Sequence, residues 1–494
     1  MSQTTSGERQ AARRRSTVIW VMCLCFVGLL FDGYDLVVFG SVLPTFLRPD
    51  GLIFNALSSQ QQQVLTAWAQ SAPPSGTPLP ADVAEAQAAA KALGGLLGSY
   101  MMIGVLVGAL TAGTLGDKFG RRKLMLGSMM WFSVGMLATA LTSTPATFGW
   151  GRFFTGIGVG ALVATTGAVV SEFAPAGKKN QLNALVYAGV PVGSMTAALL
   201  AIVALPTIHW QGMFLIGALP LVTLVPLAMW KLPESIAWLV SRGRTDEAMR
   251  LSEKTGVEVP QAPGQTRAIG EHAKGKTGWA GLFSAEFAIA AIVLGLTSAT
   301  ALLLVYSLNT WLPALMTPLL GERASLALLL VLNGGAAIGG IGAAYLADRF
   351  GAKPTVAVCF LIGAISIFLV TTTQLIGLLL LVIAVVGLGT TGTQTLIYGL
   401  ASNYYPTRVR NAGVAWVAGF GRLGGIGGPV LGGWLAIWFA DDLNAIFYIL
   451  AAMCVLGMVF CLILPRSKVD TTELFKIEPS QPSSAVPVGP DTRR

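Results

Sequence analysis

Two carboxylates, Asp32 and Asp35, lie inside an apolar run that extends from about residue 17 to residue 47 and is long enough to cross a bilayer. An ionisable side chain at membrane depth costs about 2.5 to 3.5 kcal/mol, so it usually marks a functional site with a partner. Residues i and i+3 share one face of a helix, and Gly33 between them lets a backbone or a ligand approach closely. Because two adjacent carboxylates resist double ionisation, we expect this pair to take up and release protons.

Two arginines, Arg152 and Arg422, lie in other apolar runs. With a rise of ~1.5 Å per residue, Asp32 lies ~22 Å from the N-terminal end of its run and Arg152 ~9 Å from the opposite face, so they share one depth in a core of ~30 Å. Arg422 lies ~16 Å deep, where a planar guanidinium suits a carboxylate ligand because it donates two parallel hydrogen bonds. We expect both arginines to bind an anion. The alternatives are that Arg152 is a structural partner of Asp32 and that Arg422 only packs helices.

The composition indicates which elements position these charges. The chain has 494 residues, of which 54% are hydrophobic and 11% charged, whereas a soluble domain is about 25% charged. This predicts a polytopic all-α integral membrane protein, in contact with a lipid bilayer. Twelve runs of mostly apolar residues are long enough to span it: 17–47, 93–115, 123–143, 146–172, 181–205, 210–230, 284–316, 323–347, 354–373, 375–402, 411–438 and 443–464.

The net charge of +9 is unevenly placed. If the N-terminus is cytoplasmic, the outer segments hold only Arg48, Lys91 and Arg323, and the inner segments hold almost all other lysines and arginines. This asymmetry predicts an inner (cytoplasmic) membrane protein with both termini in the cytoplasm. It also argues against a nucleic-acid partner.

Enzyme chemistry finds no support in the sequence. The five cysteines all lie in apolar runs without metal or redox spacing, and neither histidine, His209 or His272, lies in a predicted span. Carboxylates must therefore carry any protons. We expect no enzyme activity, no cofactor and no metal, and a monomeric protein.

An internal repeat divides the chain. When the two halves are overlaid, Leu115-Gly116-Asp117-Lys118-Phe119-Gly120 falls on Leu346-Ala347-Asp348-Arg349-Phe350-Gly351. Two parallel six-helix halves usually hold a substrate site between them near the midplane. The predicted segments are a polar tail at 1–16, a first half at 17–230 with a long outer loop at 48–92, a cytosolic central loop at 231–283, a second half at 284–464 and a tail at 465–494. We expect both tails to be disordered.

The run Gly113-Thr114-Leu115-Gly116-Asp117-Lys118-Phe119-Gly120-Arg121-Arg122 resembles the signature loop of the major facilitator superfamily, and it lies between the second and third predicted helices. The resemblance implies that fold: twelve transmembrane helices in two pseudo-symmetric halves that alternate access to a central site. A glutamate such as Glu172, which closes the fourth span, resembles the partner of the signature arginines. We therefore interpret Asp117, Arg121, Arg122 and Glu172 as a conformational latch. The alternative is a set of surface charges that set topology.

The run Asp32-Gly33-Tyr34-Asp35 resembles the Asp-Gly-x-Asp motif of the aromatic acid:proton symporter family. Lys353 departs from that pattern, because some members have histidine there. Several charges also match functional charges of that family: Arg152, Glu172, Asp348, Arg410 and Arg422. We assign Asp348 and Arg410 to the latch.

The resemblance implies a proton-coupled symporter that imports an aromatic carboxylate of the benzoate, hydroxybenzoate, protocatechuate or gentisate type. Aromatic side chains could stack on the ring of such a substrate, although most aromatic residues in membrane helices serve packing or lie at the interface. Three alternatives stay open: a porter for a dicarboxylate or shikimate-like acid, a proton-antiport exporter, and a transporter-like sensor. The candidate stacking residues are Tyr34, Tyr306, Trp311, Tyr398 and Trp416.

Overall fold

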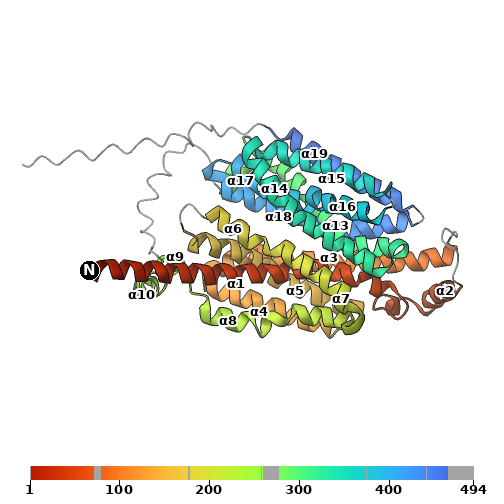
Figure 1. Ribbon diagram of the computed structural model, residues 1–494, viewed down its shortest axis with the longest axis horizontal. Helices are drawn as coiled ribbons and strands as arrows, with labels where there is room; N and C mark the ends of the chain where they lie inside the picture. The colour runs from red at the N-terminus through yellow and green to blue at the C-terminus, as the bar shows by residue number, and fades with distance from the viewer. Residues whose placement is uncertain are drawn as a thin grey trace, which may run out of the picture.

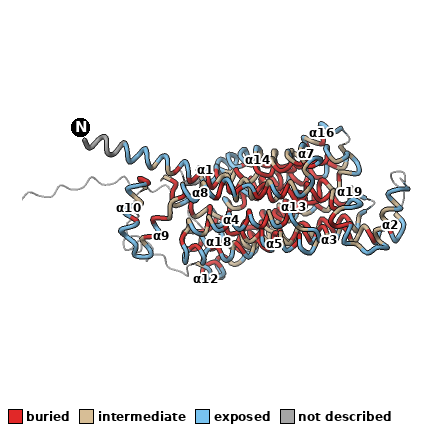
Figure 2. The backbone as a smooth tube through the Cα atoms, turned by 90° about the horizontal axis from the view of Figure 1, so that it is seen from below, coloured by how far each residue is buried: buried red, intermediate tan, exposed pale blue. Residues whose placement is uncertain are grey.

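The structure, a computed structural model, describes residues 2–71, 79–175, 179–257, 259, 278–373, 375–440 and 442–465. The described residues form helices and contain no strand (Figure 1). Figure 2 shows that the buried residues follow the middle of the long helices, whereas α2 and α10 at the two ends of the bundle are largely exposed. The all-helical fold predicted from composition is confirmed.

The long helices form two groups that pack side by side (Figure 1). The first group contains α1 (Ser2–Leu47), α3 (Ala81–Phe119), α4 (Arg121–Ala140), α5 (Pro145–Phe173), α6 (Lys179–Tyr187), α7 (Gly189–Gly217) and α8 (Leu224–Lys231). The second contains α13 (Ala288–Leu320), α14 (Glu322–Phe350), α15 (Ala352–Val370), α16 (Ile376–Gly387), the π-helical turn η3 (Leu388–Gly392), α17 (Thr393–Tyr404), α18 (Thr407–Trp438) and α19 (Leu443–Ile463).

Shorter elements connect these helices. Between α1 and α3 lie the 3₁₀ turn η1 (Phe54–Ala56) and α2 (Ser59–Gln70), so the segment predicted as an outer loop carries helices of its own. The connection between the two groups contains α9 (Ile236–Ser241), α10 (Thr245–Thr255) and α12 (Gly278–Leu282).

Within the described residues, eleven helices are long and apolar enough to cross a membrane. The sixth of the twelve predicted spans, 210–230, is not one continuous helix. His209 breaks α7 with a positive φ of 55°, and the 3₁₀ turn η2 (Leu219–Leu221) separates the end of α7 from α8. Pro220 explains part of this interruption, because proline lacks the N–H that a continuing helix needs. This crossing is therefore built from shorter helical pieces.

The turn between α3 and α4 recurs between α14 and α15. Gly120 and Gly351, which the predicted repeat places at equivalent positions, have φ values of 97° and 95°. Residues with a Cβ rarely adopt this conformation, so glycine is needed at both turns. The predicted sequence repeat thus corresponds to one turn geometry used twice.

The N-terminal segment differs from the expectation of a disordered tail, because α1 begins at Ser2. Contacts with α10 explain why the helix continues past the apolar run. Arg13 Nη1 donates to the carbonyl of Glu253 at 3.2 Å, and the Thr17 hydroxyl donates to the carbonyl of Thr255 at 3.2 Å. The C-terminal tail from residue 466 lies outside the described residues.

The two helix groups meet through three main pairs of helices: α3 with α18, α7 with α14, and α1 with α13. At Gly40 the backbone of α1 lies directly against the backbone of Asn309 in α13, where a Cβ would collide. Small residues permit such close contact between membrane helices. The backbones of α1 and α13 are therefore in close contact at the interface between the groups.

Candidate functional site

The segment of α1 that carries the two aspartates is held against α7. A Cβ at Gly33 would overlap the carbonyl of Val190, so glycine is what allows the two helices to touch. Ser194 donates a hydrogen bond to the carbonyl of Gly33 at 2.9 Å, and Tyr34 donates to the carbonyl of Met213 at 2.7 Å. These contacts fix the rotation of α1, and therefore the direction in which Asp32 and Asp35 point.

Asp35 forms an ion pair with Arg152 of α5. Both side chains are enclosed, with exposed fractions of 0% for Asp35 and 2% for Arg152. Arg152 also lies 2.7 Å from Met101 Sδ, and its guanidinium carbon lies 5.6 Å from the centre of the Phe214 ring. The guanidinium is thus surrounded by groups of its own helix group. The acidic partner of Arg152 is therefore Asp35. The rise per residue had favoured Asp32 instead, because it placed Asp32 and Arg152 at the same depth in the membrane.

Asp32 faces the other helix group. Its carboxylate interacts electrostatically with Arg422 of α18, and it is partly exposed. Arg422 Nη1 donates to the Tyr306 hydroxyl at 3.4 Å. The electrostatic neighbours of Arg422 also include Tyr398, and Tyr187 interacts with both charges. We call Asp32, Arg422, Tyr306, Tyr398 and Tyr187 the central cluster.

Three predicted stacking residues lie outside the central cluster. Tyr34 bonds to α7, as described above. Trp311 donates its indole N–H to the carbonyl of Pro429 at 2.8 Å, and Trp416 donates to the carbonyl of Ala291 at 2.8 Å. Each indole thus ties α13 to α18 within one helix group. The structure brings together two of the five aromatic candidates, Tyr306 and Tyr398.

The charges of the signature loop lie together at the end of α3. Arg121 Nη2 is 3.0 Å from Asp117 Oδ1, and Arg121 Nε is 3.7 Å from Glu172 Oε1. The backbone N–H of Arg122 donates to Glu234 Oε1 at 2.9 Å, and its guanidinium donates to the carbonyl of Met229 at 2.6 Å. These contacts stay within the first helix group and the connection that follows it. In this conformation they do not join the two groups.

The second copy of the loop is organised differently. Asp348 is exposed near the end of α14 and forms no ion pair with the residues that the structure describes. Arg410 donates to the carbonyl of Tyr405 at 3.2 Å. The neighbouring Arg408 pairs with Glu286 at 2.7 Å. The predicted latch residues of the second half therefore do not form one cluster here.

Direct bonds join the two groups near the end of the bundle at which α1 terminates, which we call the far end. Arg48 Nη2 lies 3.0 Å from Glu322 Oε2. On the neighbouring helix pair, Lys91 Nζ donates to the carbonyl of Ala436 at 2.9 Å, and further toward the middle of the bundle Ser99 of α3 donates to the carbonyl of Ile426 in α18 at 2.6 Å. The far end is therefore closed in this structure.

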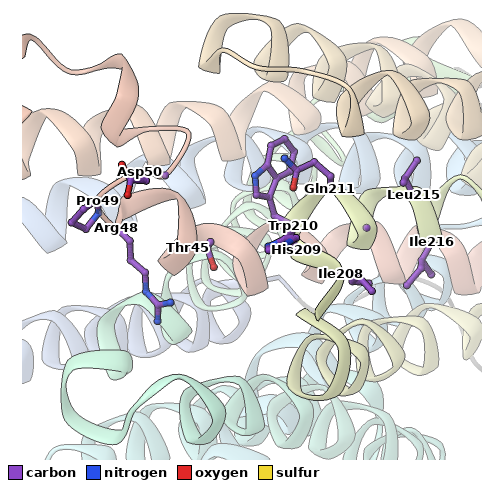
Figure 3. A pocket seen from close by; sticks show the side chains of 12 residues that line it. Thr45, Arg48, Pro49, Asp50, Ile208, His209, Trp210, Gln211, Leu215 and Ile216 are labelled. Carbon is purple, nitrogen blue, oxygen red and sulfur yellow. The ribbon is translucent and has the colours of Figure 1, made fainter. Parts of the chain in front are cut away.

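A pocket of about 860 Å³ lies beside these far-end contacts, between the end of α1 and the break in α7 (Figure 3). Its lining includes Asp50 and His209, the two non-glycine residues with positive φ in the part of the chain described. In Figure 3 Arg48 lies on the α1 side of the pocket, and His209 and Trp210 lie on the α7 side. The pocket does not include any member of the central cluster.

Comparison with known proteins places this geometry in a family. A family model described as "Sugar (and other) transporter" matches residues 20–478. The chain belongs to this family. It is 30% identical to the benzoate transport protein of Acinetobacter baylyi over 472 residues, which cover 94% of this chain and 91% of that protein. It is 28% identical to the gentisate transporter of Corynebacterium glutamicum, over 91% of this chain and 88% of that protein.

The fold of this transporter matches that of solved structures in the same superfamily. The inward-open xylose transporter XylE from Escherichia coli superposes with a TM-score of 0.70 at 18% identity, over 92% of this chain and 98% of that chain. The major facilitator fold and the resemblance to aromatic acid porters are thus confirmed. The protein is a multi-pass membrane transporter and not an enzyme. Among the described residues no group of three or more His, Cys, Asp or Glu is placed to hold a metal ion.

Sequence reasoning missed three residues of this transporter's site region. Tyr187 ends α6 in the central cluster, and Glu234 holds the signature loop through Arg122. Gln394 lies in the middle of the crossing formed by α16, η3 and α17. A usable signal was present for Gln394, because an amide inside the predicted span 375–402 is a polar group that needs a partner.

Proposed function

We propose that this transporter is a proton-coupled symporter that imports an aromatic carboxylate across the cytoplasmic membrane by alternating access, with both termini in the cytoplasm. The observation that carries the proposal is that Asp32 of the first helix group and Arg422 of the second lie within electrostatic range of one another. A proton acceptor and an anion-binding group meet there, beside two tyrosines, at the interface where a transporter of this fold is expected to bind substrate.

The charges suggest how proton and substrate are coupled. When the substrate carboxylate binds the Arg422 guanidinium, it supplies two acceptor oxygens and competes with Asp32 for the same cation. Asp32 is then a carboxylate without a counter-charge at membrane depth, and such a charge is costly. Uptake of a proton removes that cost. Substrate binding and protonation of Asp32 therefore favour one another.

The rings of Tyr306 and Tyr398 provide flat surface beside the guanidinium. Tyr306 accepts a hydrogen bond from Arg422 Nη1, so its ring is anchored close to where the carboxylate would bind. An aromatic ring gains apolar contact and a defined stacking geometry from such surfaces. The names of the relatives support the same substrate class, since they include transporters of benzoate and gentisate.

Arg152 has a different role in this proposal from the one expected on sequence grounds. Its guanidinium is enclosed by Asp35, Met101 and Phe214. We infer that the Asp35–Arg152 pair fixes α1 against α5 and does not contact the substrate. The single coupling carboxylate is then Asp32.

The far-end contacts indicate which side of the membrane the central site is closed to in this structure. If the positively charged segments are cytoplasmic, the far end is extracellular, and this structure is closed toward the outside. Import would require the Arg48–Glu322 pair to separate so that the site opens outward. The signature-loop charges at the other end, centred on Arg121, would latch the opposite state.

Uptake into proteoliposomes tests the proposal. With an inward proton gradient, wild-type protein should accumulate labelled benzoate or hydroxybenzoate, and a proton-conducting ionophore should abolish accumulation. Asp32→Asn should lose accumulation driven by the gradient but keep exchange of internal for external substrate, because its site stays neutral throughout the cycle.

The panel should include succinate and shikimate, which separate the proposal from other organic-anion porters. Gradient-driven accumulation of those acids in place of aromatic acids would refute the substrate class. Normal gradient-driven accumulation by Asp32→Asn would refute the role of Asp32 in proton coupling. Asp35→Asn is the parallel variant, which tests Asp35 for the same role. Efflux driven by an inward proton gradient would reverse the direction of transport.

A further inference from the structure

Gln394 carries an unused hydrogen-bond acceptor next to the central cluster. Its side chain is buried, with an exposed fraction of 6%, and its Nε2 donates to the Ser298 hydroxyl at 3.1 Å. Its Oε1 is buried and has no hydrogen-bond partner among the described residues. Such an orphaned acceptor costs free energy in the folded protein. The unpaired Oε1 of Gln394 is therefore available to accept a hydrogen bond from a ligand.

Two independent connections link Gln394 to the segment of α18 that carries Arg422. Ser298, which holds the amide, lies directly against Gly421, because a Cβ at that glycine would collide with the Ser298 hydroxyl. On the other side, Tyr398 follows Gln394 by one helical turn on the same face of α17, and it interacts electrostatically with Arg422. The amide and the guanidinium thus flank one region of the second helix group.

The backbone around Gln394 is also unusual. The π-helical turn η3 ends two residues before it, and π turns inside α-helices occur frequently at functional sites. A second buried oxygen, the hydroxyl Oγ1 of Thr391 in this turn, also has no hydrogen-bond partner within the described part of the chain. Two unpaired polar groups, Thr391 Oγ1 and Gln394 Oε1, therefore lie one turn apart.

We propose that Gln394 is a specificity-determining residue that accepts a hydrogen bond from a ring hydroxyl of the substrate, so that the preferred substrates are 3- or 4-hydroxylated aromatic acids. This inference rests on the proposed function. With the carboxylate on Arg422, a hydroxyl on the far side of the ring is the group that can extend to a second anchor. A 2-hydroxyl is different, because it bonds to the substrate's own carboxylate.

The unpaired acceptor of Gln394 makes this arrangement selective. A site built to bond a substrate hydroxyl rejects the analogue that lacks it, because its own buried polar group is then left unpaired. Benzoate would leave Gln394 Oε1 unpaired, whereas 4-hydroxybenzoate would satisfy it. Ser298 acts as a positioning residue in this scheme, since its hydroxyl holds the amide nitrogen and so aims the oxygen.

Equilibrium binding to the purified protein in detergent tests the proposal, with benzoate, 2-, 3- and 4-hydroxybenzoate as ligands. Wild type should bind the 3- or the 4-hydroxy acid more tightly than benzoate. Gln394→Leu should reduce that preference about two- to tenfold, the effect of one net hydrogen bond, while benzoate affinity is unchanged or slightly improved. Ser298→Ala should reduce the preference less. Thr395→Val, at the adjacent and exposed position of α17, is the matched control and should keep it.

Benzoate and 2-hydroxybenzoate binding report whether each variant is folded. An unchanged hydroxyl preference in Gln394→Leu overturns the proposal, as does an equal loss for benzoate and 4-hydroxybenzoate, which would mark Gln394 as a packing residue. If Gln394→Leu binds no ligand, Ser298→Ala decides by the same ratio. A wild type that binds none of the four acids would refute the proposed function itself, whereas intact binding with an unaltered ratio in the variants refutes only the role of Gln394.

Discussion

Removing the Arg152 guanidinium should destabilise the protein much more than removing an exposed arginine. In Arg152→Ala the carboxylate of Asp35, with an exposed fraction of 0%, loses its ion-pair partner. Breaking a buried pair from one side costs about 3 to 5 kcal/mol, because the remaining charge has neither water nor a partner. If the pair is structural, the double variant Asp35→Asn with Arg152→Met should recover most of this loss, since replacing both charges is often close to neutral.

The control is a second arginine that also pairs with a carboxylate but lies in water. The side chains of Arg48 and Glu322 are 49% and 31% exposed, so Arg48→Ala should cost less than about 1 kcal/mol. Unfolding in mixed micelles, followed by circular dichroism as SDS is raised, measures the changes in free energy. The reasoning fails if Arg152→Ala is as stable as Arg48→Ala, or if the double variant is no more stable than Arg152→Ala alone.

Three further changes separate the remaining roles. Arg422→Lys keeps the positive charge but loses the planar guanidinium that can donate two parallel hydrogen bonds. Equilibrium binding of every aromatic acid should weaken by about tenfold, the effect of one hydrogen bond to a charged group, while binding of the neutral benzamide is unchanged. Equal losses for the acids and benzamide would make Arg422 a packing residue. Arg121→Ala should lower the turnover rate with little change in substrate affinity, and a large loss of equilibrium binding at unaltered turnover would contradict a latch. Glu322→Gln removes the exposed ion pair with Arg48, so the far end should open more often. The alkylation rate of a cysteine introduced by Ser99→Cys should then rise by at most about fivefold when Glu322→Gln is added. An unchanged alkylation rate would exclude the Arg48–Glu322 pair as a gate.

The sequence predicted the parts of this fold that depend on composition and repetition. The runs of apolar residues located the long helices, and the overlay of the two halves identified the recurrent turn at Gly120 and Gly351. The sixth span was harder to predict, because hydropathy does not register that His209 and η2 interrupt the helix. The polar composition of residues 1–16 favours disorder, and it could not reveal the contact with α10, because that contact comes from a segment that is distant in the sequence.

The contacts of the site were harder to predict from the sequence, because a residue on a helix is placed by its depth along the axis and by its direction around the axis. Run lengths give only the depth. The rise per residue placed Arg152 at the level of Asp32, and Asp35 is less than one turn further along, so an estimate from run lengths could not separate them. The rotation of α1 decides the pairing, and that rotation depends on the contact of Gly33 with α7. The same limit applies to Trp311 and Trp416, whose depth suited stacking but whose indoles bond to neighbouring backbone.

The two aspartates differ in whether their partners move relative to them. Asp35 and Arg152 belong to the same helix group, so their separation is preserved when one group rocks against the other. Asp32 and Arg422 belong to different groups, so the same motion changes their distance and hence their Coulomb energy. In the proposed mechanism, only the second pair therefore links a protonation state or a bound anion to the position of the two halves. In that mechanism one aspartate holds α1 in place, while the other, three residues away, couples the protonation and anion occupancy of the site to the conformational equilibrium.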